Sequence, residues 1–396
     1  MKILFLVDGH VLELGGAELQ AFTLAKTLRS QGHEVEVVAP HLDRSTPQRS
    51  TREGTVVRQL GYWRLPKLGN ILFMLRFALF LVREGRNYDA IHIHIHIHMV
   101  HNMAAVVSLL RFLAPCPVVA KISGAFEFAD GQANHSPPAT SLKFWLYKCL
   151  HGLDYFQTIS ADTHQRLVAA GVPAEKIVGI PNGVNTEHFE PSKALHNTEV
   201  KADAKTVIAY CGRLVPVKQL HTLIDAAAIL QKKFPSQFEL RLHGTGCLEG
   251  TLEAQVARLG LEKSVRFCGR TEDVAKSLQQ AHIYTQVSEY EGLSNAVLEA
   301  MSSGLPLVLS EVGGNKDVVN PGENGYLVSS GDATALAMAL APLIRDRDLC
   351  RQLGQQSRTL AEQKFSLKSV TARLLCLYNN SACGSEAGCA RRAAAN

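Results

Sequence analysis

QVSEYEGLSNAVLEAMSSG, at residues 286–304, is the stretch on which the interpretation of this chain depends. It continues an apolar run at residues 281–287 that is typical of a buried strand. A short acidic loop follows, and GLSN at residues 292–295 begins a segment with helical character. Ser294 is a preferred N-cap residue, because its hydroxyl can accept a hydrogen bond from an amide of the first turn. We therefore expect a strand, a tight loop and a helix in direct succession.

Two glutamates flank this turn, Glu291 just before the helix and Glu299 two turns into it. A carboxylate accepts hydrogen bonds through two oxygens, so it suits adjacent hydroxyls of a sugar ring or a ribose. Gly292 lets a ligand approach the backbone closely, and the N–H groups of a helix start suit a phosphate or sugar oxygen. On this stretch alone, a ligand site and an ordinary capped helix with two solvated glutamates are equally open.

The composition predicts two domains. A chain of 396 residues is too long for one compact core, and 46% hydrophobic with 19% charged residues is a normal globular balance. The net charge of +5 fits an anionic substrate or an anionic membrane surface. It is too diffuse to indicate nucleic acid.

The cysteines and the apolar runs predict a cytoplasmic protein. The nine cysteines are odd in number and lack paired spacing, which favours free thiols over disulfides or a zinc site. The first apolar segment begins at residue 2, so no secretory signal is expected, and no apolar run reaches about 18 residues.

The first 40 residues predict a βαβ unit, with strands at residues 2–7 and 34–39 and a helix at 17–30. Gly15 and Gly16 precede the helix, and by themselves they are as well explained by a plain turn. Their pattern is not G-x-G-x-x-G, so a dinucleotide fingerprint is not supported. Residues 40–54 are polar and predict a mobile loop.

NILFMLRFALFLVR, at residues 70–83, predicts a strongly apolar helix. One interpretation is a membrane-docking surface flanked by Lys67, Arg83 and Arg86. The other is a helix packed on the sheet, and the pattern favours it.

YDAIHIHIHIHM, at residues 88–99, predicts a strand that places four alternating histidines on one face. Aligned imidazoles suggest a metal site, but no local carboxylate or cysteine completes one. His96, His98 and His101 are expected near the carboxyl end of the strand, where α/β sheets bind ligands.

The spacing Glu291-x7-Glu299 within EGLSNAVLEAMSSGLP resembles the signature of the retaining nucleotide-sugar glycosyltransferases of family 4, the group 1 glycosyl transferases. The resemblance extends in the family's order from GGAE near the start to about residue 377. Two differences are a Gln219 where the family's G-R-L-x-x-x-K-G ends in glycine, and an Asn185 where its P-N-G-V-D ends in aspartate. The other matching segments are PNGVN at 181–185, GRLVPVK at 212–218, EVGGN at 311–315 and NGYLV at 324–328.

The resemblance implies an α/β fold of the GT-B type, in which two Rossmann-like domains face each other across a deep cleft. The expected parts are an acceptor-side domain at residues 1–190, a linker at 191–204, a nucleotide-sugar domain at 205–365, a helix packing back on the first domain at 366–379 and a disordered tail at 380–396.

The resemblance also assigns roles. Arg213 and Lys218 are expected to stabilise the departing diphosphate, and Glu291 to contact the sugar; these three are the candidate catalytic residues. Glu299 is expected to hold the ribose hydroxyls. The full candidate set for donor binding is Gly15, Gly16, Gly212, Gly244, Arg270, Thr271, Gly292, Leu293, Ser294, Asn295 and Glu299.

One departure concerns the acceptor side. Many relatives carry His-Gly where this chain has Ser123-Gly124, which removes a polar partner of the transferred sugar. Lys121 and Ser123 are the candidates to replace it, and His98 is a candidate for acceptor binding.

The expected function is transfer, with retention, from a nucleotide-diphosphate sugar to a saccharide or lipid-linked saccharide. A UDP-sugar is favoured, with GDP-mannose as the second choice, and cell-surface glycan or lipopolysaccharide biosynthesis is the expected setting. No cofactor, metal ion or nucleic acid is expected, whereas peripheral association with the cytoplasmic face of the inner membrane is. The alternatives are a GT-B epimerase and a binding protein that has lost its chemistry.

Overall fold

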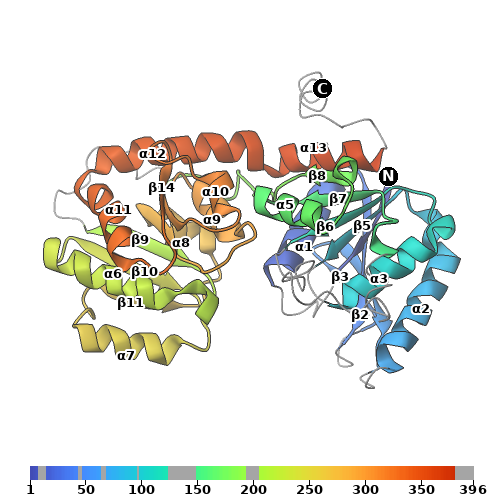
Figure 1. Cartoon of the computed structure of the whole chain (residues 1–396), viewed down its shortest axis with the longest axis horizontal. Helices are drawn as coiled ribbons and strands as arrows, with labels where there is room; N and C mark the ends of the chain where they lie inside the picture. Colours follow the sequence, from blue (N-terminus) through green and yellow to red (C-terminus); the bar gives the residue numbers. More distant parts are fainter. Residues whose placement is uncertain are drawn as a thin grey trace. The chain divides into compact units, whose positions relative to one another are not determined.

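A computed structural model of the chain describes residues 1–7, 15–42, 47–63, 68–95, 98–123, 149–192 and 205–379. The chain divides into two compact units (Figure 1). The first consists of Met1–Asn182 with Leu367–Asn396, and the second of Gly183–Ser366. Each unit contains a sheet of mostly parallel strands covered by helices, which confirms the predicted α/β class with two Rossmann-like domains.

The sheet of the first unit has eight strands in the order β3-β4-β2-β1-β5-β6-β7-β8. All neighbours run parallel except the β3–β4 pair, which is antiparallel. This hairpin corrects the expectation of a mobile loop at residues 40–54. The polar sequence of β3 gives no sign of a strand, but the segment pairs with β4 at the edge of the sheet. The strands are β1 (Lys2–Leu6), β2 (Glu34–His41), β3 (Arg49–Arg52), β4 (Thr55–Gly61), β5 (Ala90–Ile95), β6 (Val118–Ile122), β7 (Tyr155–Thr158) and β8 (Ile177–Gly179).

Helices cover both faces of this sheet, and each face has its own apolar core. Side chains of α1 and α13 fill the core on one face, and those of α2 and α3 fill the core on the other. A hydrogen bond of 3.0 Å from Gln31 Nε2 to Thr371 Oγ1 ties the end of α1 to α13. The helices are α1 (Gly16–Ser30), α2 (Leu68–Glu84), α3 (His98–Leu109), α5 (Ala161–Ala169) and α13 (Leu367–Tyr378), with short turns η1 (Gly85–Asn87), η2 (Arg111–Leu113) and η3 (Ala174–Lys176).

The predicted strand at residues 88–99 is shorter than expected. It ends at Ile95, and His98 is the first residue of α3, so the prediction of four histidines on one strand face is wrong. His92 and His94 do share a strand face, but His98 belongs to a helix that reverses the chain after the buried strand. His96 lies outside the described residues, as do the tail at 380–396 and most of the expected linker.

The sheet of the second unit has six parallel strands in the order β11-β10-β9-β12-β13-β14. Its strands are β9 (Thr206–Cys211), β10 (Phe238–His243), β11 (Val265–Gly269), β12 (Ile283–Gln286), β13 (Leu307–Ser310) and β14 (Gly325–Val328). Its helical elements are η5 (Pro216–Lys218), α6 (Leu220–Lys233), α7 (Glu249–Leu259), α8 (Val274–Gln279), α9 (Asn295–Ser302), α10 (Asn315–Val318), α11 (Ala333–Arg345), α12 (Arg347–Leu360) and a π-helical turn η6 (Ala361–Phe365).

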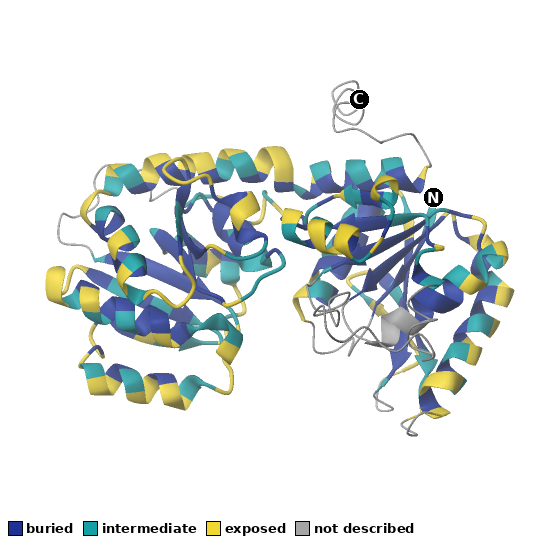
Figure 2. Cartoon of the chain, viewed as in Figure 1, coloured by how far each residue is buried: buried dark blue, intermediate teal, exposed yellow. Residues whose placement is uncertain are grey.

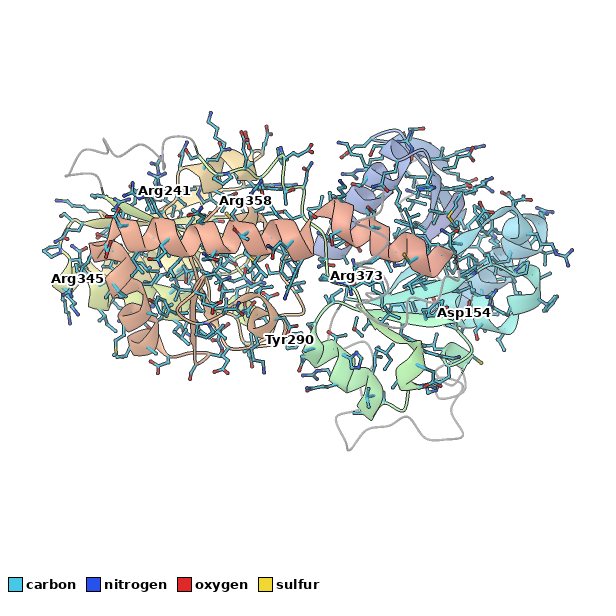
Figure 3. All side chains as sticks on the ribbon, turned by 90° about the horizontal axis from the view of Figure 1, so that it is seen from above. Asp154, Arg241, Tyr290, Arg345, Arg358 and Arg373 are labelled. Atoms are coloured by element: carbon cyan, nitrogen blue, oxygen red, sulfur yellow. The ribbon has the colours of Figure 1, made fainter. Side chains whose placement is uncertain are left out.

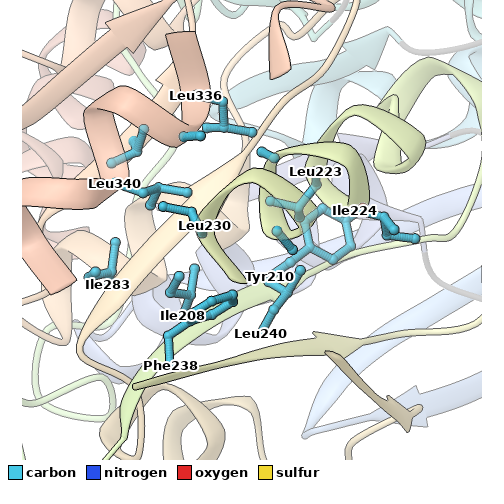
Figure 4. Close-up of a cluster of buried hydrophobic side chains, with 14 of the residues drawn as sticks. Ile208, Tyr210, Leu223, Ile224, Leu230, Phe238, Leu240, Ile283, Leu336 and Leu340 are labelled. Carbon is cyan, nitrogen blue, oxygen red and sulfur yellow. The ribbon is translucent and has the colours of Figure 1, made fainter. Parts of the chain in front are cut away.

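The core of the second unit lies between its central strands and the helices α6 and α11 (Figure 4). β9 is buried at every position, as its apolar sequence predicts for a central parallel strand. Ile208 of β9, Leu230 of α6 and Leu340 of α11 meet in this core.

One arginine fastens the start of the second unit to its helices. Arg358 of α12 (Figure 3) donates from Nη1 to the carbonyl oxygens of Thr186 at 2.9 Å and Phe189 at 2.8 Å. The same nitrogen donates to the carbonyl of Ser302 at 2.6 Å. Because three carbonyls share one guanidinium, the chain after the PNGVN motif is held against the end of α9. Among the described residues, no helix is both long and apolar enough to cross a membrane.

Candidate functional site

The predicted catalytic residues of the second unit, and the predicted donor-binding Gly244, lie on loops at the carboxyl ends of its strands. Arg213 and Lys218 follow β9, Gly244 follows β10, and Glu291 follows β12. In an open parallel sheet this edge is where ligands bind, because the loops there are free to vary while the strands hold their bases in place.

The carboxylate of Glu291 is at the centre of the site. Its Oε1 atom accepts a hydrogen bond from Ser288 Oγ at 2.9 Å and another from Gln286 Nε2 at 2.5 Å. It also forms an ion pair with Nζ of Lys218. No described residue donates a hydrogen bond to Oε2. The side chain is therefore fixed through one oxygen, and the hydrogen-bonding capacity of the other is unused by the described residues.

Gln286 links this carboxylate to the start of α9. Its Oε1 atom accepts hydrogen bonds from Ser294 Oγ at 3.1 Å and from the buried Tyr284 hydroxyl at 3.0 Å. Ser294 occupies the predicted N-cap position, but its hydroxyl makes no capping bond. The predicted capping bond is therefore wrong, because the hydroxyl is used to orient Gln286 and, through it, Glu291.

Lys218 is the last residue of η5, and the residue after it has a left-handed backbone conformation. The next residue, Gln219, has φ 44° and ψ 41°, in the left-handed region that favours glycine. Glycine, which the sequence comparison expected at this position, adopts this conformation without a Cβ clash. The Gln219 side chain accepts a hydrogen bond from Ser330 Oγ at 2.8 Å, and Ser330 Oγ also lies 3.1 Å from the carbonyl oxygen of Ser288.

Arg213 lies in the same neighbourhood with an exposed side chain. Its carbonyl oxygen accepts a hydrogen bond of 2.9 Å from the hydroxyl of Tyr210. Burial raises the pKa of Tyr210 above its usual range, and the charge of Glu291 raises it further while that of Arg213 lowers it. The charges of Glu291 and Arg213 thus act on the pKa of the same buried tyrosine.

Glycines allow the loops of this edge to approach one another. A Cβ added at Gly244, whose φ is +141°, would lie 1.8 Å from the carbonyl oxygen of Gly212. A Cβ at Gly212 would lie 2.7 Å from the Tyr210 hydroxyl. Gly212 and Gly244, both predicted donor-binding residues, are therefore packed against each other where no side chain fits.

Gly313 and Gly314 lie against the backbone of Glu291 and Gly292, and they were not among the site residues predicted from the sequence. A Cβ at Gly313, with φ +43°, would lie 1.6 Å from the carbonyl oxygen of Glu291. The amide of Gly314 donates to the carbonyl of Gly292 at 2.8 Å. The EVGGN motif was the signal for this contact, since paired glycines permit such an approach of two backbones.

Glu299 is the fifth residue of α9, and no described residue hydrogen-bonds to its carboxylate. Burial raises the pKa of Glu299 to about 7, because desolvation penalises the ionised form. Its charge acts on the pKa of the buried Cys211 at the end of β9. A desolvated carboxylate at this edge gains most from a ligand that supplies hydroxyl donors.

The remaining predicted donor-binding residues of the second unit form two groups. Arg270 is exposed, whereas the Thr271 hydroxyl is engaged locally with the Asp273 carbonyl at 3.2 Å. They follow Gly269, whose carbonyl accepts a hydrogen bond from Gly244 at 2.7 Å. Gly292, Leu293, Ser294 and Asn295 lie together at the start of α9.

The first unit contains the other candidates. Gly15 and Gly16 begin α1, and Lys121 lies in β6, in register with His94 of β5 and Gln157 of β7. Lys121 is buried, and desolvation lowers its pKa to about 7. Ser123 follows β6, and its buried Oγ has no hydrogen-bond partner among the described residues. The side chains of His96, His98 and His101 are outside what the structure describes.

The two histidines of β5 belong to the core. Their rings stack with centroids 4.3 Å apart, and His92 Nδ1 lies 2.5 Å from the Tyr378 hydroxyl of α13. Burial lowers the pKa of His92 to about 3, and both ring nitrogens of His94 lack a partner among the described residues. No group of three or more potential metal ligands occurs within the described ranges.

Comparison with known proteins decides the family. A family model described as Glycosyl transferases group 1 matches residues 192–360, and one described as Glycosyltransferase Family 4 matches residues 14–188. Together they match most of the chain. The chain belongs to the group 1 glycosyltransferases.

Several proteins resemble this group 1 family member. EpsD of Bacillus subtilis is 32% identical over 234 residues, which cover 57% of this chain and 60% of that protein. The phosphatidyl-myo-inositol mannosyltransferase of Mycobacterium leprae is 25% identical and matches over 92% of both chains. The matched parts of the first three curated relatives span 38% to 60% of their lengths.

Solved structures support the fold. Anabaena HepE in complex with UDP has a TM-score of 0.74 at 22% identity, with 96% of this chain and all of that chain covered. Sucrose-phosphate synthase of Thermosynechococcus elongatus has a TM-score of 0.76 at 21% identity, covering 97% of this chain and all of that one. These neighbours establish the GT-B fold of this family member.

Proposed function

We propose that the protein is a retaining glycosyltransferase that moves a sugar from a nucleotide-diphosphate sugar to a saccharide or lipid-linked saccharide. The observation that carries this proposal is the geometry of Glu291. Lys218, Gln286 and Ser288 fix its Oε1 atom, while no described residue donates to Oε2. A carboxylate held in this way presents one oxygen in a set direction, which suits the hydroxyls of a sugar ring.

Lys218, which pairs with this carboxylate, and Arg213, on the same loop after β9, support the assignment of a leaving diphosphate. As the bond between the anomeric carbon and the phosphate oxygen breaks, negative charge grows on the diphosphate and positive charge on the sugar. The Arg213 guanidinium is exposed, and the Lys218 ammonium retains N–H donors beyond the one directed at Glu291. Charge-assisted hydrogen bonds of this type contribute about 1.5–3 kcal/mol each. Preorganised donors need no reorganisation during the reaction.

The proposed chemistry is departure and attack on the same face of the sugar. The bond between the anomeric carbon and the phosphate oxygen breaks, and a bond from that carbon to the acceptor oxygen forms. The acceptor proton passes to the departing phosphate, so the anomeric configuration is retained. With the cationic charge supplied by Arg213 and Lys218, the reaction is proposed to be independent of metal ions.

A UDP-sugar is the proposed donor. The structural neighbour HepE has been solved with UDP-glucose, with a TM-score of 0.73 at 23% identity. GDP-mannose is the second candidate, because the relative from Mycobacterium leprae is named a mannosyltransferase. Glu299, a partly buried carboxylate with no hydrogen-bond donor among the described residues, is the proposed partner of the ribose hydroxyls.

The acceptor is proposed to be a surface glycan or its lipid-linked precursor. One relative, LpsE of Rhizobium meliloti, is named a lipopolysaccharide core biosynthesis glycosyltransferase; it is 31% identical over 44% of this chain and 49% of its own length. Lys121 and Ser123 of the first unit are the proposed acceptor-side residues. The seven described cysteines are all free thiols, which supports a cytoplasmic location, and a lipid-linked acceptor would place the enzyme at the inner face of the membrane.

A donor panel tests this proposal. A thermal-shift screen of UDP, GDP and ADP identifies the nucleotide, since a bound ligand raises stability by mass action. Sugar transfer is then followed with and without acceptor, in the presence and absence of EDTA, and the anomeric configuration of the product is determined by NMR. We expect a retained configuration and no effect of EDTA.

The other outcomes distinguish the alternatives. Donor isomerisation without an acceptor would identify an epimerase. Nucleotide binding with neither transfer nor donor hydrolysis would identify a binding protein. An inverted product would contradict the retaining mechanism.

A further inference from the structure

The outward face of α2 is apolar, although it is not covered by the rest of the described protein. On the inward face, Phe73, Phe77, Phe80 and Leu81 fill the core of the first unit. On the opposite face, five apolar side chains are between 47% and 62% exposed. They are Leu68, Ile71, Leu75, Leu79 and Val82.

These five side chains form one continuous stripe along the helix. Their spacing of three or four residues places them on the same side of an α-helix over its whole length. Exposed segments recur along α2 in Figure 2. Monomeric proteins seldom expose a continuous apolar surface of this kind without a partner for it.

Further exposed apolar side chains lie at both ends of this stripe. A Cβ added at Gly69 would lie 2.0 Å from the carbonyl oxygen of Trp63, so the half-exposed Trp63 sits against the amino end of α2. A Cβ added at Gly85 would lie 2.8 Å from the carbonyl oxygen of Leu113. The η2 turn, with its exposed Phe112, therefore packs beside the carboxyl end.

The charges on the helix are positive and lie along one edge of the stripe. Arg76 and Arg83 are exposed, and each directly follows a residue of the stripe, seven positions apart. The Arg76 guanidinium lies 4.5 Å from the centroid of the Trp63 ring. The one acidic residue of α2, Glu84, is paired with Arg58.

We propose that the outward face of α2 docks on an anionic lipid surface. The apolar stripe would enter the boundary between headgroups and acyl chains, and the two arginines would meet the lipid phosphates. Trp63, with an apolar ring and a polar N–H, belongs at the same depth. The helix lies along the membrane and does not cross it, because its other face is part of the protein core.

Charge complementarity favours lipid over a second copy of the chain. Two such faces packed together would bring four arginines into one interface, and α2 offers no unpaired carboxylate to neutralise them. An anionic bilayer supplies the negative charge and the apolar layer at once. This inference concerns a surface separate from the Glu291 site, and it does not depend on the identity of the donor.

Vesicle flotation of the full chain tests the inference without any sugar present. The probes are vesicles of phosphatidylcholine alone and of phosphatidylcholine with about one third phosphatidylglycerol. We expect the protein to float with the anionic vesicles. The double variant Leu75→Glu with Leu79→Glu should lose about tenfold or more of this binding. Arg76→Gln with Arg83→Gln should lose the preference for anionic lipid and the sensitivity to salt.

A matched control is available on the second unit. Met338 of α11 and Ile229 of α6 are 72% and 40% exposed, and the double change of both to Glu should leave flotation unchanged. Equal melting temperatures of the variants would show that they are folded, as expected for surface positions. The inference is overturned if the wild-type protein stays unbound, or if the α2 variant floats like the control.

Light scattering tests the rival occupant. A wild-type dimer that Leu75→Glu with Leu79→Glu converts to a monomer would assign the face to self-association and would overturn the proposed lipid contact. A monomer in both proteins agrees with it.

Discussion

Lys218 and Glu291, 73 residues apart in the sequence, form an ion pair between the loops that follow β9 and β12. The pair joins the proposed diphosphate-binding cation to the proposed sugar-binding carboxylate. Because Gln286 and Ser288 bind the same oxygen of Glu291, the position of each member depends on the others.

We expect Arg213→Ala and Lys218→Ala each to lower kcat by about a hundredfold or more, which corresponds to about 3 kcal/mol of lost transition-state stabilisation. The protein should remain folded, since neither side chain is part of the core. Turnover is measured with saturating donor, and Lys232→Ala, an exposed lysine on α6, serves as the control. Wild-type turnover in either variant would show that the leaving group is stabilised elsewhere.

Glu299 should make donor binding depend on pH. Its pKa of about 7 means that the side chain is largely protonated at pH 6 and ionised at pH 8. The ionised form accepts the ribose hydroxyls, so the affinity for UDP-glucose should rise by roughly tenfold between these pH values. Calorimetric titration of Glu299→Gln should give a flat pH profile, whereas Glu289→Gln should keep the wild-type slope. A pH-independent affinity of the wild-type protein would remove Glu299 from the ribose site.

The same pKa predicts an effect on stability. The unfolded chain releases its proton near the ordinary pKa of glutamate, whereas the folded protein holds it up to about pH 7. Stability is therefore lost as pH rises between these values. At pH 8 the free energy of unfolding of Glu299→Gln should exceed that of wild type by up to about 3 kcal/mol. At pH 4 the two values should be equal. An identical difference at both pH values would indicate a packing effect.

Gln219 should reveal the backbone strain next to Lys218. At a left-handed position glycine avoids the Cβ clash, so Gln219→Gly should be more stable than Gln219→Ala by about 1 kcal/mol. Both variants lose the bond to Ser330, so that loss cancels in the comparison. Denaturant unfolding measures the difference. If Gln219→Ala were instead the more stable variant, as expected within an ordinary helix, Gln219 would not adopt the left-handed conformation.

His94 should make the first unit sensitive to acid. Burial lowers the pKa of His94 well below its usual value, so in acid the unfolded chain binds a proton that the folded protein does not. Stability should then fall as pH drops below about 6.5. His94→Leu, which removes two unpartnered nitrogens, should be at least as stable at neutral pH and less sensitive to acid. Melting temperatures across this pH range measure both effects.

The sequence by itself determined the alternation of strands and helices and the family, and it supplied the residues that are proposed for the candidate site. Most strands of the two sheets are rich in apolar residues, and the EGLSNAVLEAMSSG motif places two carboxylates around one helix start, so these features are encoded locally. The sequence placed the motifs of Lys218 and Glu291 at the same site, but it did not predict the ion pair between them.

The tertiary structure decided which partner each side chain has. Ser294 lies at the predicted helix start, yet its hydroxyl binds Gln286, because a side chain brought close by the fold competes with the local amide. The strand pattern of the histidines could not reveal that His98 begins a helix. Which face of α2 is buried was also undetermined, because apolar residues occupy two opposite faces of this helix and the sequence alone does not show which of them meets the core.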